Sequence, residues 1–209
     1  MPAYHGGPLQ DRAELRDHPH EYVPRQGRVS RHRGDGERGR REAAASGPRV
    51  RCGSEAGGIV SAGEVNLLGK RPLGAGGKLA LREVLERLLA EHDSTSGVNV
   101  CFVDDSEIRK LNRDYLGHDY ATDVVTFPMR RAGESAEGDP LVDDLLGEVV
   151  VSVDTARRYA ESRGVDLPRE LALYAIHGVL HLLGYDDGEP AARRKMRRAE
   201  RRYLDTFLP

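Results

Sequence analysis

Two histidines one helical turn apart, followed by a glycine and two aspartates, are the side chains of this sequence best placed to do chemistry. His177 and His181 are four positions apart, so on a helix both imidazoles project from one face. Gly184 lets the chain leave the helix, and the following turn can bring Asp187 back to the imidazoles. The spacing therefore predicts a three-ligand site for a divalent metal, and zinc suits these donors best.

Simpler interpretations of the same residues remain open at this point. Histidines at this spacing are usually surface groups or hydrogen-bonded core residues, but here they lie in an apolar segment, where unpaired polar groups are costly. Asp186 is the alternative to Asp187 as third ligand, or it orients one of the histidines.

The spacing His-x3-His-x2-Gly-x2-Asp matches the zinc helix of metzincin peptidases, some of which use an aspartate as third ligand. This ten-residue offset favours Asp187 over Asp186. Those peptidases place a glutamate general base directly after the first histidine, whereas this chain has Gly178 there. A zinc metallopeptidase is therefore the disfavoured alternative.

Composition indicates one domain with a tail. The chain has 209 residues, of which 32% are charged, and a formal net charge of −2. Residues 1–55 are rich in Arg, Gly and Pro and lack apolar periodicity, so we expect a disordered tail before a domain over residues 56–209. No apolar run is long enough for a membrane helix. We expect a cytoplasmic monomer with reduced thiols, in which Cys101 belongs to the core.

The pattern of apolar residues and caps predicts the elements that must position the site. Strands are expected within 58–68 and over Val98–Val103, Asp123–Phe127 (stopped by Pro128) and Gly147–Val151. Between the last two strands lies a polar loop, Arg130 to Asp144. The first helix is expected over Lys78–Glu91, and the second runs from a capping box at Asp104 and Glu107 to about Tyr115. The third runs from the cap Ser152 to Arg163 and is followed by Gly164. The fourth begins at Asp166 and includes the apolar segment Leu171–Leu183, and the last begins at Pro190.

Three ordered sequence blocks resemble one known family. The first is the run from His177 to Asp187. The second comprises Leu111-Asn112, Tyr115, Asp119 and Thr122–Pro128, and the third is Leu146–Ser152. Together they resemble the YbeY family of bacterial single-strand-specific endoribonucleases over about residues 78–206.

The resemblance implies a single α+β domain, with a small mixed β-sheet packed against about five helices and the zinc-binding helix in the centre. It implies one Zn²⁺ ion held by His177, His181 and Asp187. It also implies action on ribosomal RNA and the small ribosomal subunit, in maturation of the RNA 3′ end and in ribosome biogenesis. A non-catalytic assembly factor with a structural zinc is the second alternative.

Three positions depart from the family pattern. The third ligand is usually histidine and is Asp187 here, and Ala121 replaces a proline. The arginine expected after Tyr115 is Leu116, so either another cation meets the phosphate or the chain is less active. Arg113, one turn earlier, is a candidate substitute, although a solvated helix arginine is the simpler interpretation.

The expected reaction is attack of a zinc-activated water on phosphorus in single-stranded RNA. No side chain stands out as the general base. Arg113, His118 and Asp123 are possible helpers, and Asp123 also suits a capping or turn role. Basic residues around the last helix could grip phosphates, or could simply form a solvated face: Arg193, Arg194, Lys195, Arg197, Arg198, Arg201 and Arg202.

Overall fold

The computed structural model describes residues 21–22, 63–70, 72–129 and 145–208. Its helices are α1 (Ala75–Glu91), α2 (Asp105–Leu116), α3 (Val153–Arg163), α4 (Leu167–Leu182) and α5 (Pro190–Leu204). Its strands are β1 (Glu21–Tyr22), β2 (Val65–Gly69), β3 (Gly97–Val103), β4 (Val124–Pro128) and β5 (Leu145–Ser152). The elements expected from the sequence are present in the predicted order.

The strands form one mixed sheet in the order β1-β4-β5-β3-β2. Strand β3 pairs in parallel with both β2 and β5, whereas β4 runs antiparallel to β5. The two residues of β1 pair in parallel with Val125 and Thr126 of β4. This arrangement confirms the predicted α+β class with a small mixed sheet and five helices.

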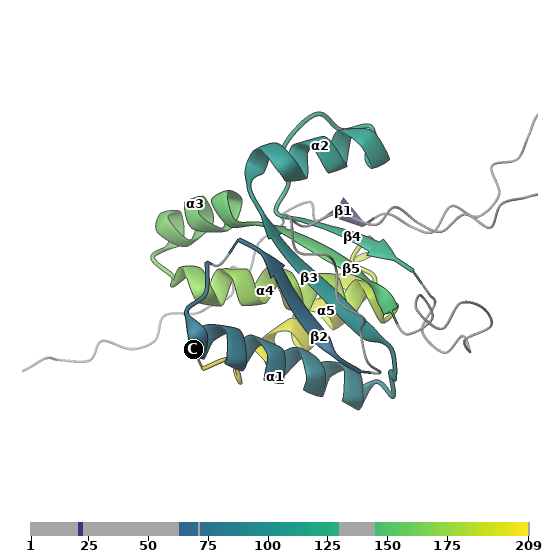
Figure 1. Cartoon of the computed structure of the whole chain (residues 1–209). Coiled ribbons are helices and arrows are strands. Elements are labelled where there is room, and N and C mark those ends of the chain that lie inside the picture. The colour runs from purple at the N-terminus through teal and green to yellow at the C-terminus, as the bar shows by residue number, and fades with distance from the viewer. Residues whose placement is uncertain (1–20, 23–62, 71, 130–144, 209) are drawn as a thin grey trace, which may run out of the picture.

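Helices cover the two faces of the sheet unequally (Figure 1). The larger core joins α1, α4 and α5 to one face through residues such as Leu85, Val149 and Ile176. The smaller core joins α2 to the other face through Ile108 and Phe127. Helix α4 lies against β4 and β5 and also contacts α1, α3 and α5, so the predicted central position of this helix is confirmed.

The predicted helix caps are formed. Asp104 and Glu107 make a reciprocal capping box at the start of α2. The Ser152 side chain accepts a hydrogen bond from the backbone N–H of Thr155 at the start of α3. Gly164 ends that helix in the left-handed conformation, with φ of 63°.

Several observed boundaries differ from the predicted ones by one to three residues. Pro128 does not stop the strand before it but forms its last residue, paired with Gly147 of β5. A proline is tolerated there because its missing N–H costs little at a strand end. Asp123, predicted as the first strand residue, lies just before β4. The predicted polar loop Arg130–Asp144 and the predicted tail, apart from Glu21–Tyr22, lie outside the described residues.

The expectation of reduced thiols is also wrong for Cys101, which is fully buried and disulfide-bonded. The only other cysteine of the chain, Cys52, lies outside the described residues. An isolated cysteine such as Cys101 carries no spacing signal, and disulfide formation depends on proximity in the fold, which composition does not contain. Among the described helices, none combines the length and the apolar character needed to cross a bilayer.

Stability at low pH should depend on the capping box of α2. Asp104 accepts hydrogen bonds from the Ser106 hydroxyl at 2.7 Å and from the Glu107 N–H at 2.9 Å. These bonds hold the pKa of Asp104 at about 2, below its ordinary value of 3.8. Because the pKa is lower in the folded state, the stabilisation is complete above about pH 4 and is lost as the pH falls toward 2.

We expect Asp104→Ala to lower the free energy of unfolding at pH 7 by about 0.5–2 kcal/mol. Asp104→Asn keeps the acceptor oxygen and is the matched control. Asp104→Asn should stay close to the wild type at pH 7. The stability difference between Asp104→Ala and the wild type should shrink from pH 4 to pH 2. Urea denaturation at several pH values measures both effects, and equal stability of Asp104→Ala and the wild type would contradict the cap assignment.

Candidate metal centre

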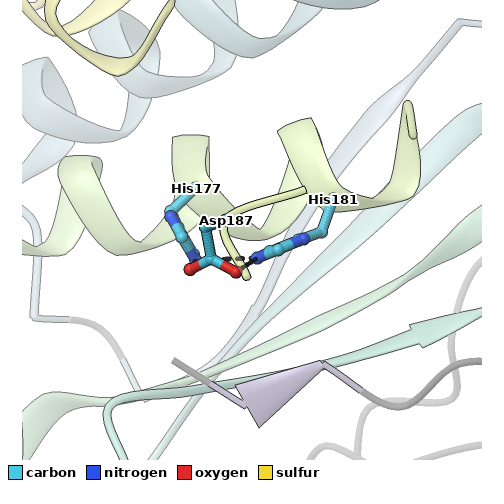
Figure 2. Close-up of side chains that lie close together, drawn as sticks. All are labelled: His177, His181 and Asp187. Carbon is cyan, nitrogen blue, oxygen red and sulfur yellow. Dashed lines mark hydrogen bonds and ion pairs between the residues drawn. The ribbon is translucent and has the colours of Figure 1, made fainter. Parts of the chain in front are cut away.

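Helix α4 presents the two predicted histidines side by side in the protein interior (Figure 2). His177 and His181 are 1% and 5% exposed, so neither is a surface group. Their rings meet at an interplanar angle of 83°, and the two Nε2 atoms lie 3.0 Å apart. The four-residue spacing has therefore placed both Nε2 atoms at one point, as the sequence predicts.

The turn after α4 brings a carboxylate to the same point. The helix ends at Leu182, and Gly184 adopts a φ of +88°, which favours glycine. The Asp187 side chain then lies with Oδ2 at 4.0 Å from Nε2 of His177 and Oδ1 at 3.8 Å from Nε2 of His181. It is half-buried, with 27% of the side chain exposed, so the cluster has one side near solvent.

The dimensions of this cluster fit a small metal ion. With bonds of about 2.1 Å, neighbouring donors in a tetrahedral zinc site lie roughly 3.4 Å apart. The three donor separations, 3.0, 3.8 and 4.0 Å, bracket that value. All three donor atoms lie within 4.8 Å of one another, so small side-chain movements would complete the coordination.

Glu200 of α5 orients the first histidine. Its Oε1 lies 2.6 Å from Nδ1 of His177, and the carboxylate is buried. A carboxylate only accepts, so in a neutral imidazole Nδ1 carries the proton and Nε2 presents its lone pair to the cluster. Such carboxylate–histidine pairs are typical of metal sites, where they fix the ring and raise its basicity.

The second histidine is oriented by the backbone. Nδ1 of His181 lies 3.0 Å from the carbonyl oxygen of Tyr185, which also only accepts. In this tautomer both imidazoles, if neutral, point the Nε2 lone pairs at each other across 3.0 Å, beside the Asp187 carboxylate. Two lone pairs beside a carboxylate form a donor set that could hold a metal ion.

Glu200 was not identified in the sequence, although a signal was present. It is the only acid within the basic run from Arg193 to Arg202. It also follows Met196 by four residues and precedes Tyr203 by three, so it falls on the apolar stripe of α5. A buried acid on such a stripe needs a partner, and only the packing of α5 against α4 shows that the partner is His177.

Asp186, the alternative third ligand, is engaged elsewhere. Its Oδ1 accepts hydrogen bonds from the backbone N–H groups of Asp187 and Gly188 at 2.8 and 3.1 Å. These bonds, that from Gly188 foremost, lower the pKa of Asp186. Arg193 of α5 closes the same turn by donating to the carbonyls of Asp187 and Gly188 at 3.0 and 3.2 Å. Asp186 thus shapes the turn that presents Asp187.

Gly178 lies where α4 approaches the sheet most closely. A Cβ at this position would lie 2.4 Å from Cγ1 of Val149 and 3.2 Å from Oγ1 of Thr126. Any larger side chain would push the helix away from β4 and β5. The glutamate that metzincin peptidases carry at this position therefore has no space here.

The three predicted helper residues are not part of the His177–His181–Asp187 cluster. Arg113 is half-exposed and pairs with Asp114 at 3.1 Å and Asp119 at 3.9 Å. The ring of His118 stacks on that of Tyr120. Buried Asp123 accepts from the Thr122 hydroxyl and from the Val124 N–H, which fits its turn role. Leu116, at the position of the expected family arginine, packs against the smaller core.

Comparison with known proteins identifies the family. Residues 77–208 match the family model described as Endoribonuclease YbeY. The chain belongs to this family. Proteins called Endoribonuclease YbeY from Salinibacter ruber and Desulfitobacterium hafniense are 39% and 45% identical over 145 and 114 residues. These matches cover 66% and 54% of this chain, and 87% and 72% of the two relatives.

A solved structure is also similar to the chain. The solution structure of TM1509 from Thermotoga maritima is 31% identical, with a TM-score of 0.49. The match covers 68% of this chain and 88% of that protein. The resemblance inferred from three sequence blocks is thus confirmed by the family match, and the chain is a member of a family of endoribonucleases, which are hydrolases.

Glu200 should control the affinity of the centre for metal. We expect Glu200→Ala to weaken zinc binding roughly 10- to 100-fold, because His177 loses the acceptor that fixes its ring and tautomer. Glu189→Gln is the matched control, since Glu189 is exposed and makes no side-chain capping bond at the start of α5. Competition with a chelating dye measures the affinity, and an unchanged value for Glu200→Ala would remove Glu200 from the site.

Proposed function

We propose that this chain is a zinc-dependent, single-strand-specific endoribonuclease that acts in maturation of the small-subunit ribosomal RNA 3′ end. Family membership supports cleavage of RNA. The observation that supports zinc dependence is the pair of Nε2 atoms that face each other beside Asp187. The proposal includes action as a monomer in the cytoplasm, on the RNA of the small ribosomal subunit.

The donor count favours a catalytic role over a structural one. A structural zinc site has four protein ligands, whereas the described residues contribute three donors to this cluster. When bound, zinc would supply Lewis-acid activation of water and of the phosphodiester. His177, His181 and Asp187 would hold the ion, while Glu200 and the Tyr185 carbonyl keep both imidazoles in the binding tautomer.

A cation that meets the phosphate would come from outside the family motif, because Leu116 is apolar and Arg113 is already ion-paired. We assign this role to the exposed side of α5. Glu200 fixes α5 against His177, so the helix lies directly beside the centre. Within the basic run of α5, Arg193 binds the Asp187 turn, Lys195 lies over the Tyr185 ring and Arg202 pairs with Glu91. The exposed residues left to contact phosphates include Arg194, Arg198 and Arg201.

Removing the third ligand tests the proposed activity. We expect Asp187→Ala to lose bound zinc, with affinity at least 10- to 100-fold weaker, and to stop cleaving precursor RNA of the small subunit. Asp187→His, which restores the usual family ligand, should keep both properties. Asp166→Ala changes an exposed aspartate that makes no capping bond and is the control. Elemental analysis and RNA cleavage with and without chelator give the two readouts.

The outcomes separate the alternatives. Cleavage that persists after chelation would contradict metal dependence. Stoichiometric zinc without any cleavage would favour the assembly factor with a structural zinc. Peptide hydrolysis in place of RNA cleavage would favour the metallopeptidase.

Charge reversal on α5 tests the phosphate contacts. Replacing Arg194, Arg198 and Arg201 together by glutamate should reduce the salt dependence of RNA binding by a slope of about 2, because each phosphate contact with a single strand contributes roughly 0.7. Arg157→Glu on α3 removes an exposed arginine elsewhere and should leave the slope unchanged. A slope that the triple variant does not alter would show that α5 presents only a solvated face.

A further inference from the structure

A short loop after α2 holds two aromatic rings in a fixed, exposed arrangement. Gly117 ends α2 with φ of 76°, and the chain then folds back onto the helix. The N–H of His118 donates to the carbonyl of Asn112 at 3.3 Å. The buried Asn112 side chain in turn donates to the carbonyl of Tyr120 at 3.1 Å. One buried asparagine thus fixes both ends of the segment from His118 to Tyr120.

Within this segment the two rings are already stacked. The His118 and Tyr120 rings have centroids 5.6 Å apart and planes inclined by only 9°. Tyr120 is 49% exposed, and His118 is also exposed. Asp119 between them is bound by Arg109 through two hydrogen bonds of 2.9 Å. The segment therefore holds two exposed, mutually stacked aromatic side chains next to a guanidinium group.

The end of α2, which precedes this aromatic pair, and the metal centre lie on opposite faces of the sheet, at the same strand β4. Tyr115, at the end of α2 and 42% exposed, rests edge-on against Phe127 of β4 with centroids 5.3 Å apart. The preceding residue of β4, Thr126, points to the other face of the sheet. There it contacts α4 at Gly178, directly after His177. The end of α2 and the metal centre therefore flank the same short strand.

We propose that the His118–Tyr120 pair is a stacking platform for unpaired bases of RNA, and that it contributes to selectivity for single strands. The proposal rests on the proposed action on RNA. An unpaired base offers open ring faces to a platform of this kind, whereas bases inside a duplex are covered by their neighbours.

Two variants of Tyr120 test the platform. Tyr120→Ala removes the ring and should weaken binding of a single-stranded oligoribonucleotide on the order of ten- to hundredfold, as for other base–aromatic contacts. Tyr120→Phe keeps the ring and should bind like the wild type. His118→Ala, a second disruption in the same exposed segment, should cause a similar loss. Leu79→Ala removes an exposed apolar side chain on α1 and is the control for surface changes.

Binding is measured by fluorescence anisotropy on the full chain in the presence of chelator, so that cleavage does not interfere, and circular dichroism checks the fold. The probes are a single strand and a hairpin duplex of equal length. If Tyr120→Ala binds the single strand more weakly and the duplex as tightly as the wild type does, the result supports the platform. Unchanged single-strand affinity in Tyr120→Ala, or an equal loss for both probes, overturns it.

The result is distinguishable from failure of the proposed function. If RNA binding depends on Tyr120 but metal-loaded protein cleaves no RNA, the proposed function fails and the platform stands. If metal-dependent cleavage is present and Tyr120→Ala binds single strands normally, only the platform fails. In that case the exposed rings would serve a different partner, such as a protein.

Discussion

The close approach of α4 to the sheet at Gly178 is the contact on which the rest of the site depends. Only a hydrogen atom fits between the helix backbone and Val149 of β5, so the helix lies directly on the sheet. This contact fixes the rotation of α4 about its axis and hence the direction of His177 and His181. Both imidazoles are buried, which makes the hydrogen bonds of their ring nitrogens a condition for a stable fold.

Those hydrogen bonds determine how the neighbouring elements are arranged. Each imidazole has an acceptor at Nδ1, supplied by Glu200 of α5 for His177 and by the carbonyl of Tyr185 for His181. Both Nε2 atoms are then left to face the Asp187 carboxylate. The turn and α5 therefore serve the fold and the candidate centre at once, because the contacts that satisfy buried histidines also prepare them to bind a cation.

Much of this could be predicted from the sequence, because the signals were local. The capping box at Asp104, the cap at Ser152 and the helix end at Gly184 each depend on a few neighbouring residues. Contacts between distant segments were missed. In the sequence Glu200 is one charge in a basic run, and only the fold places it against His177. His118 is a possible helper by sequence, whereas in the fold its ring stacks on that of Tyr120. The disulfide of Cys101 was missed for the same reason.

The sequence by itself determined the elements, their order and the family, and it predicted the residues of the candidate centre, since helical spacing and glycine conformation act over a few positions. Tertiary structure decided how those residues are used. In the folded chain the Asp187 carboxylate lies near the two imidazoles, whereas the Asp186 carboxylate accepts hydrogen bonds from backbone N–H groups of the turn. It also paired Glu200 with His177, 23 positions apart, which follows only from the packing of α5 on α4.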